Sequence, residues 1–179
     1  MRLRAGDVGV VLAAMEFAAR KHKDQRRKDK DASPYINHPI ALANVLWTEG
    51  EVRDPEVIAA ALLHDTLEDT ETTYEELRGQ FGAMVADMVA EVTDTKWLDK
   101  KVRKRLQVTK AAKSSRGAKL VKLADKICNL RDMIASPPAT WKLERRREYF
   151  DWAKTVVDQL RGTNEKLERR FDRIYRQRP

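Results

Sequence analysis

Apolar residues recur every three or four positions along most of the chain, which is the spacing of one buried helix face. This pattern predicts nine helices joined by short loops. The first begins with Asp7 as its cap, runs to about Lys23 and is followed by a polar, basic loop over residues 24–34. Its apolar face is expected to consist of Val8, Val11, Leu12 and Met15.

Start and stop signals mark the helices that follow. Pro39 suits the first turn of the second helix, and Asp54 with Pro55 opens a third helix that is expected to continue through Leu67. Further signals, in chain order, are Thr73 with Glu76, Gly82, Ser115, Pro137, Thr140 with Glu144, and Gly162. No segment alternates with a period of two, so the sequence predicts an all-α fold.

The composition allows one domain with a substantial core. The chain has 179 residues, of which 42% are hydrophobic, so we expect residues 1–179 to form a single domain. No apolar run approaches the ~20 residues that span a bilayer, and residues 1–7 lack a signal-peptide pattern. We therefore expect a soluble, cytoplasmic protein without a membrane partner. Since Cys128 is the single cysteine, a metal ion would have to be held by histidines and carboxylates.

Charge is distributed along the chain in blocks. The formal net charge is +8, with 36 Lys and Arg against 28 Asp and Glu. Residues 20–30 carry seven basic and two acidic side chains, residues 49–94 two basic and thirteen acidic, and residues 96–122 eleven basic and one acidic. These blocks indicate an acidic, metal-binding site that faces a basic wall and takes a small anionic partner. The alternative for most of these charges, including the basic stretch over residues 161–179, is a set of solvated helix faces.

His64 and Asp65 stand in an otherwise apolar helix, where a charged carboxylate beside a histidine needs a partner or a cation. Glu68 and Asp69 follow one helical turn later, so four ionisable side chains emerge at one end of this helix. The arrangement predicts a metal site. The alternative is an ordinary buried histidine whose helix is closed by a cluster of carboxylates.

Two further segments favour the metal site. His38 directly precedes Pro39 at the start of a helix, and Asp125 lies in an apolar helix with Asn129 one turn later. Two histidines and two aspartates offer mixed nitrogen and oxygen ligands, which favours Mn, Fe, Co or Zn over Ca or Mg. The choice among these ions stays open from the residues alone.

The order of His38, His64 with Asp65, and Asp125 resembles the pattern of the HD-domain metal-dependent phosphohydrolases. Residues 18–29, 34–39, 61–70 and 121–126 look more specifically like the hydrolase half of the RelA/SpoT group, and the chain is most similar to the small stand-alone alarmone hydrolases of the MESH1 type. The similarity extends over nearly the whole chain and implies a single HD-domain helical bundle without synthetase activity. The loop over residues 29–33 departs from the short Ser-Gly-Glu type of the long bifunctional enzymes.

The resemblance implies hydrolysis of guanosine 3′,5′-bis(diphosphate) and its pentaphosphate form to GDP or GTP and pyrophosphate, with one manganese ion in the site. The metal ligands that it implies are His38, His64, Asp65 and Asp125. It assigns Glu68 and Asp69 to positioning and deprotonating the attacking water, a task that a carboxylate near the metal can perform. The substrate contacts that it implies are Arg27, Lys28, Lys100, Lys101, Asn129, Arg145 and Tyr149.

Two other functions fit the residues. The chain could be an HD phosphohydrolase for another phosphorylated nucleotide, because fold and metal do not fix the substrate. It could also be a nucleic-acid-binding helical module, although we expect no nucleic-acid partner because no recognised nucleic-acid module is present. His22 is expected to lie at the surface or pack against a loop rather than to act as a fifth metal ligand. An oligomer is compatible with the sequence, but no residue argues for one.

Overall fold

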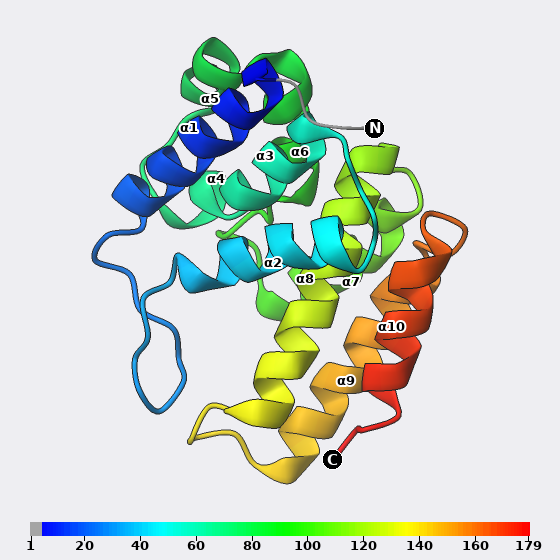
Figure 1. Ribbon diagram of the computed structural model, residues 1–179. Coiled ribbons are helices and arrows are strands. Elements are labelled where there is room, and N and C mark those ends of the chain that lie inside the picture. The colour runs from blue at the N-terminus through cyan, green and yellow to red at the C-terminus, as the bar shows by residue number, and fades with distance from the viewer. Residues whose placement is uncertain (1–4) are drawn as a thin grey trace.

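The computed structural model describes residues 5–179 and consists of helices joined by loops (Figure 1). The ten helices within these residues are α1 (Ala5–Lys21), α2 (Asn37–Thr48), α3 (Pro55–Leu63), α4 (Thr66–Asp69), α5 (Tyr74–Phe81), α6 (Ala83–Val92), α7 (Lys100–Ala111), α8 (Arg116–Ala135), α9 (Leu143–Asp158) and α10 (Glu165–Tyr175). The one β-bridge found in this range joins Arg26 to Pro34 across the loop between α1 and α2. The predicted all-α fold is confirmed.

The long helix α8 lies at the centre of the bundle. It packs against α2, α3 and α6 and also against α9 and α10, so it joins the N-terminal and C-terminal helices (Figure 1). Helix α3 is buried along nearly its whole length, from Val57 to Leu63. The meeting of α2, α3 and α8 therefore brings three separate stretches of sequence to one place in the interior.

Several predicted helix starts are confirmed by their capping bonds. The side-chain oxygens of Asp54, Thr73 and Ser115 each accept a hydrogen bond from a backbone N–H in the first turn of α3, α5 and α8, respectively. Helix α9 begins at Leu143, later than the expected start at Thr140. Its N-cap residue makes no side-chain cap, so the local sequence signal for this start is weak.

The first helix differs from its prediction in two respects. It begins at Ala5, so Asp7 lies in its first turn and not at its cap. The predicted apolar face was wrong at Val8 and Leu12, which are 41% and 53% exposed, whereas Val11 and Met15 are half-buried against the core. Apolar residues surround this helix on more than one side, and packing favours the side that carries Phe17, whose ring meets the ring of Phe81 at 5.4 Å between centroids. The residues of α1 that are buried are Ala14, Phe17 and Ala18.

The third predicted helix is two helices in the structure. It was expected to run through Leu67, but α3 ends at Leu63 and α4 begins at Thr66. Asp65, with φ −101° and ψ 0°, leaves regular helical geometry. The hydroxyl of Thr66 donates to the carbonyl oxygen of Leu63 at 2.7 Å and so stabilises the turn through a side chain. His64 and Asp65 consequently stand at a corner between two helices.

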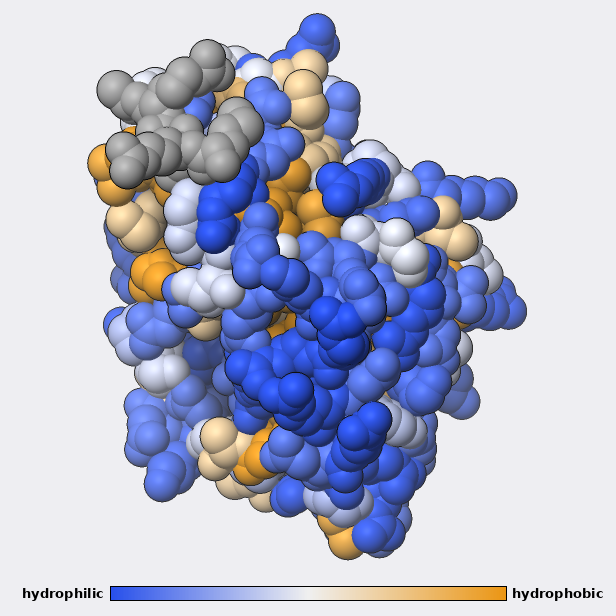
Figure 2. Space-filling view, turned by 45° about the vertical axis from the view of Figure 1, so that its right-hand side comes forward, coloured by the Kyte–Doolittle hydropathy of each residue, from blue (hydrophilic) through white to orange (hydrophobic). Residues whose placement is uncertain are grey.

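Hydrophilic residues cover most of the face seen in Figure 2, and apolar residues reach that surface in small patches. The basic C-terminal stretch pairs with acidic neighbours, as a solvated helix face does: Arg161 contacts Asp172 at 2.6 Å and Arg178 contacts Asp151 at 2.6 Å. Within residues 5–179, no helix has both the length and the apolar character needed to cross a membrane.

Candidate active site

Three elements far apart in sequence bring the predicted metal ligands together. His38 lies in the first turn of α2, His64 and Asp65 form the corner between α3 and α4, and Asp125 lies midway along α8. All four line one cavity of about 240 Å³, which we call the metal cavity after these predicted ligands. The predicted acidic pair, Glu68 and Asp69 of α4, lines the same cavity. The fold therefore gathers every residue that the sequence assigned to the metal and the attacking water.

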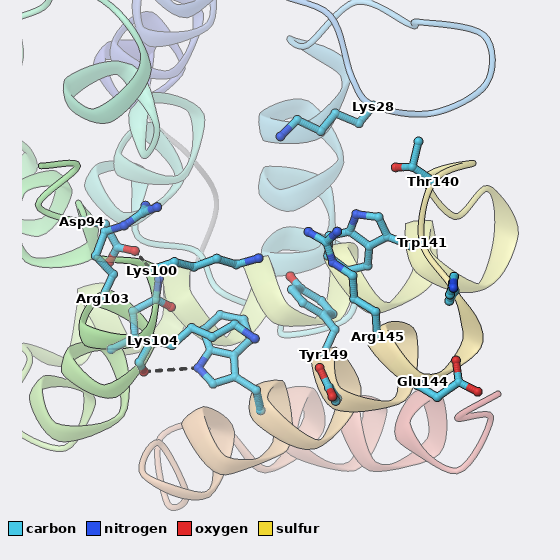
Figure 3. Close-up of a pocket in the computed structure, with 14 residues that line it drawn as sticks. Lys28, Asp94, Lys100, Arg103, Lys104, Thr140, Trp141, Glu144, Arg145 and Tyr149 are labelled. Atoms are coloured by element: carbon cyan, nitrogen blue, oxygen red, sulfur yellow. Dashed lines mark hydrogen bonds between the residues drawn. The ribbon is translucent and has the colours of Figure 1, made fainter. Parts of the chain in front are cut away.

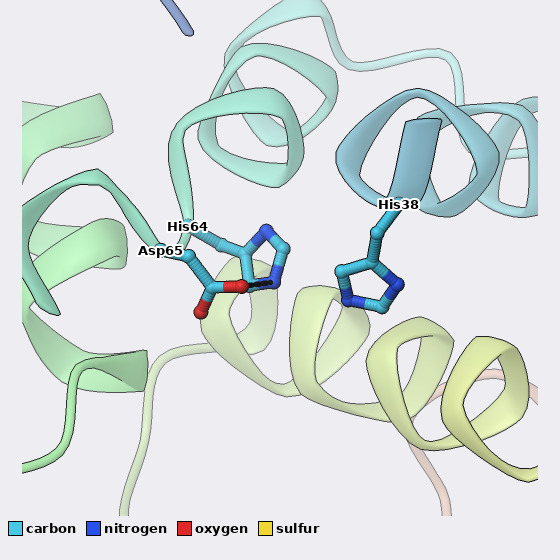
Figure 4. A group of neighbouring side chains, drawn as sticks. All are labelled: His38, His64 and Asp65. Atoms are coloured by element: carbon cyan, nitrogen blue, oxygen red, sulfur yellow. Dashed lines mark ion pairs between the residues drawn. The ribbon is translucent and has the colours of Figure 1, made fainter. Parts of the chain in front are cut away.

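The two histidines and Asp65 form a compact group. One ligand atom from each of His38, His64 and Asp65 lies within 4.8 Å of the others. Both histidines are buried, and their ring centroids are 5.3 Å apart. Figure 4 shows His64 and Asp65 side by side at their corner, with His38 reaching toward them from α2. These residue types at this spacing suit a divalent transition-metal ion.

The contacts of His64 leave one ring nitrogen available to a cation. Its Nδ1 lies 2.9 Å from the carbonyl oxygen of Ala61, which only accepts, so Nδ1 carries the proton. Its Nε2 is buried and lies 2.8 Å from Oδ2 of Asp65. Two electron-pair donors so close together require a cation between them. In the absence of a metal ion, burial lowers the pKa of His64, but the Asp65 carboxylate outweighs burial and raises the pKa to about 9. A metal ion fits the same position.

Asp125 adjoins this group and has other partners. Its Oδ1 accepts a hydrogen bond from Asn129 at 2.6 Å and lies 3.3 Å from Nε2 of His38, while its Oδ2 contacts the ammonium of Lys126 at 2.9 Å. Burial raises the pKa of Asp125, but Lys126 and the histidines outweigh it and hold the pKa well below the usual range. A carboxylate oxygen accepts more than one bond, so these contacts are compatible with a metal ligand. That role for Asp125 stays a prediction.

Tyr35 is a site residue that the sequence analysis did not identify. Its hydroxyl donates to Oδ2 of Asp65, and its ring contacts those of His22 and His38. Burial and the Asp65 carboxylate both raise the pKa of the Tyr35 hydroxyl, so it remains a hydrogen-bond donor. Its position three residues before His38, at the entry to α2, was the available signal.

The two residues of the acidic pair are held in different ways. Oε2 of Glu68 accepts from the backbone N–H of Asp94 at 3.0 Å, and burial raises the pKa of Glu68. Asp69 uses both oxygens, because Oδ2 accepts from Gln25 at 2.9 Å and Oδ1 accepts from Lys96. Burial therefore favours the protonated form of Glu68, whereas Asp69 accepts hydrogen bonds at both oxygens.

A second cavity, of about 670 Å³, adjoins the metal cavity and shares Tyr149 with it. Six basic side chains line it against three acidic ones, and the basic residues are Lys28, Lys100, Arg103, Lys104, Lys142 and Arg145. Figure 3 shows Lys28 reaching in from the loop before α2 and Arg145 stacked beside Trp141, with 4.1 Å between the guanidinium carbon and the ring centroid. A surplus of positive charge in a concave site attracts polyanions.

A third cavity, also of about 670 Å³, shares Arg27, His38 and Asn129 with the metal cavity. Arg27 pairs there with Asp132 of α8. Six of the seven predicted substrate residues thus line the three adjoining cavities. The seventh, Lys101, is exposed and lies outside the residues that line them, so its substrate contact stays a prediction.

Two buried lysines of α8, Lys122 and Lys126, also line the metal cavity and were not among the predicted site residues. Burial, assisted by Lys126, lowers the pKa of Lys122 to about 8. The Lys126 ammonium lies 4.6 Å from the ring centroid of Trp152. In the sequence both lysines belong to a long apolar helix pattern, where a lysine ordinarily reaches solvent along its flexible stem, so periodicity gave no sign of their burial.

Comparison with known proteins agrees with this geometry. Residues 14–151 match the family model described as HD domain. The chain belongs to the HD domain family. It is 51% identical to the guanosine-3′,5′-bis(diphosphate) 3′-pyrophosphohydrolase MESH1 of Danio rerio over 98% of both chains, and 54% identical to the protein of the same name from Homo sapiens over 94% of both.

A solved structure supports the same placement within the HD domain family. It is described as a metazoan orthologue of SpoT that hydrolyses ppGpp, and it aligns with a TM-score of 0.92 and 49% identity over 99% of this chain and 98% of that one. The resemblance to RelA/SpoT-type HD domains of the MESH1 kind, and the helical bundle that it implied, are confirmed.

Proposed function

We propose that this HD domain is a metal-dependent hydrolase that removes pyrophosphate from the 3′ position of guanosine 3′,5′-bis(diphosphate) and of its pentaphosphate form. The products are GDP or GTP and pyrophosphate. The observation that carries the proposal is one centre in which a His-His-Asp group, an acidic pair and a strongly basic cavity adjoin. Near full-length similarity to the MESH1 hydrolases supports the same activity.

We assign the metal ion to four ligands, namely His38, His64, Asp65 and Asp125. A divalent ion bound there would lower the pKa of the attacking water and neutralise charge on the 3′ diphosphate. We propose a single Mn²⁺, since nitrogen and oxygen ligands together suit it and the family resemblance implies it. The Ala61 carbonyl fixes the tautomer of His64, and the Tyr35 hydroxyl fixes the orientation of Asp65.

We assign Glu68 as the acceptor of the proton from the attacking water. Burial raises its pKa, which moves its proton affinity toward the neutral range where a general base is effective. The bond from the Asp94 N–H holds its carboxylate in place. Asp69, with both oxygens engaged, orients the attacking water rather than taking the proton.

The substrate carries two diphosphate groups, and we assign each of them to one of two adjoining cavities. With the 3′ diphosphate at the metal group, the 5′ diphosphate reaches the basic cavity lined by Lys28, Lys100 and Arg145. Tyr149 lies between the two, since it lines both cavities. The nucleoside contacts are assigned to Arg27 and Asn129, with Lys101 retained as a predicted phosphate contact.

The activity is tested by incubating the purified chain with guanosine 3′,5′-bis(diphosphate) and Mn²⁺ and separating the products by anion exchange. We expect GDP and pyrophosphate in equal amounts, and no hydrolysis of GTP, which lacks a 3′ diphosphate. Consumption of a different phosphorylated nucleotide, with this substrate left intact, supports an HD phosphohydrolase of other specificity. Absence of any turnover, together with nucleic-acid binding that weakens steeply with salt, supports the nucleic-acid module. The cytoplasmic location and the single domain over residues 1–179 stay predictions.

A further inference from the structure

His22 is a buried histidine that takes no part in the proposed metal group. It directly follows α1, continues that helix by donating its N–H to the carbonyl of Ala18 at 2.9 Å, and is 2% exposed. The expectation that it packs against a loop agrees with this burial, while the expectation of a surface position does not. Its Nδ1 lies 2.6 Å from Oε1 of Gln25. Its Nε2 is buried without a hydrogen-bond partner in residues 5–179.

Gln25 connects this histidine to the acidic pair. Its Nε2 donates to Oδ2 of Asp69 at 2.9 Å. An ionised carboxylate only accepts, so Gln25 must turn its NH₂ group to Asp69 and its amide oxygen to His22. The amide oxygen also only accepts, so Nδ1 of His22 carries the proton. The two bonds therefore have one direction, from the imidazole through the amide to the carboxylate.

Backbone hydrogen bonds hold the main chains of His22 and Gln25 in place. The N–H of Gln25 donates to the carbonyl of His22 at 3.0 Å, and the N–H of Tyr35 donates to the carbonyl of Gln25 at 3.1 Å. The His22 ring lies against the ring of Tyr35, with 4.9 Å between centroids and 35° between planes. Since neither residue can swing away without breaking these contacts, the amide of Gln25 is held in one orientation.

The other contact of Asp69 is weaker as an anchor. Its Oδ1 faces Lys96, whose side chain is 52% exposed and belongs to the loop between α6 and α7. An exposed ion pair on a flexible side chain contributes little and is screened by salt. Without Gln25, the carboxylate of Asp69 would be free to rotate about its remaining contact with Lys96.

We infer that His22 and Gln25 are positioning residues that hold the Asp69 carboxylate in the orientation required for hydrolysis. The inference rests on the proposed function, because it gives Asp69 its place in that reaction. His22 lines none of the three cavities, so it touches neither substrate nor metal, and its hydrogen bond reaches the acidic pair through Gln25. Misplacing a catalytic group by about 1 Å can cost roughly 10²-fold in rate.

Two substitutions of His22 separate the hydrogen bond from the ring packing. His22→Phe keeps a flat ring against Tyr35 but removes the Nδ1 donor, whereas His22→Asn keeps an N–H near the Nδ1 position and loses the ring. We expect kcat to fall about ten- to a hundredfold in His22→Phe, with KM and Mn²⁺ affinity little changed, and less in His22→Asn. His22→Asn turning over as slowly as His22→Phe, or more slowly, overturns the inference.

A second variant removes the middle of the chain of bonds. Gln25→Leu should lose at least as much kcat as His22→Phe, and Gln80→Leu, on the exposed side of α5, is the matched control that should behave like the wild type. In the Gln25→Leu background, His22→Phe should cause little further loss, because its effect passes through Gln25. If the losses of kcat in the two single variants multiply fully in the double variant, His22 does not act through Gln25.

A measurement independent of turnover tests the direction of the bonds. Because the chain has three histidines, their imidazole ¹⁵N signals can be assigned by substitution in the metal-free protein. We expect His22 to carry its proton on Nδ1, and an Nε2–H tautomer overturns the inference. Inactivity of the wild type toward guanosine 3′,5′-bis(diphosphate) contradicts the proposed function, whereas an active wild type with an equally active His22→Phe contradicts the positioning role alone.

Discussion

Glu68→Gln tests the proposed proton transfer most directly. Glutamine has nearly the same shape, and its amide oxygen can still accept from the Asp94 N–H that holds Glu68 at 3.0 Å. The fold and the metal group should therefore be preserved, while the amide cannot take a proton from water. A positioned general base contributes about 10²–10⁴-fold, or about 2.7–5.4 kcal/mol of barrier, and we expect kcat to fall by that factor.

The assay for Glu68→Gln measures kcat and KM for guanosine 3′,5′-bis(diphosphate) at saturating Mn²⁺, with Mn²⁺ affinity taken from titration calorimetry. Glu71→Gln, an exposed neighbour two residues beyond Asp69, is the control and should match the wild type. In the wild type, kcat/KM should fall as pH drops through the pKa of Glu68, which burial raises above its ordinary 4.5, because the protonated carboxyl cannot accept a proton. That acid limb should vanish in Glu68→Gln. A kcat within threefold of the wild type, or loss of Mn²⁺ affinity alongside turnover, would refute the reasoning.

Asp65→Ala should lose Mn²⁺ affinity and turnover together, and hydrolysis that survives without bound metal would contradict the ligand role. Lys100→Ala should raise KM for the substrate several-fold because it removes a charge from the basic cavity, while exposed Lys101→Ala changes KM little; equal effects in steady-state assays would count against the cavity. Glu49→Gln should lower the free energy of urea unfolding by about 1–2 kcal/mol, since Glu49 accepts bonds from Arg131 at 2.7 and 2.8 Å. Those bonds hold the pKa of Glu49 below its ordinary 4.5, so the difference should be complete above pH 4.5 and shrink as pH falls through the lower folded value. A difference that does not change with pH would contradict that assignment.

Local sequence chemistry predicted most helix starts, because a cap is decided within a few residues. Asp54, Thr73 and Ser115 make the capping bonds that their sequence context indicates. The buried face of α1 could not be read in the same way. Apolar residues lie on more than one side of that helix, and the choice among them is made by contacts with α3 and with the Phe81 ring, which are distant in sequence.

Ionisable side chains in apolar helix patterns indicated the metal site, and family resemblance supported it and added the substrate contacts. Together they named the histidines and aspartates that the fold gathers into one cavity. They did not name Tyr35, Gln25 or the buried lysines Lys122 and Lys126, whose roles depend on which side chain they meet across the fold. A tyrosine that donates to Asp65, or a glutamine that donates to Asp69, becomes recognisable only when the two segments lie side by side.

The break between α3 and α4 has a chemical cause that explains why periodicity missed it. In a continuous helix, consecutive residues point about 100° apart around the axis, so His64 and Asp65 could not face the same point. The turn at Asp65 lets its Oδ2 approach Nε2 of His64 to 2.8 Å while both face His38. The apolar pattern over residues 55–67 reflects the burial of this segment. The same residues would be buried in one continuous helix or in two, so the pattern does not reveal the break. Convergence of the metal group requires the departure from helical geometry, so the failed element prediction falls at the residues on which the proposed chemistry depends.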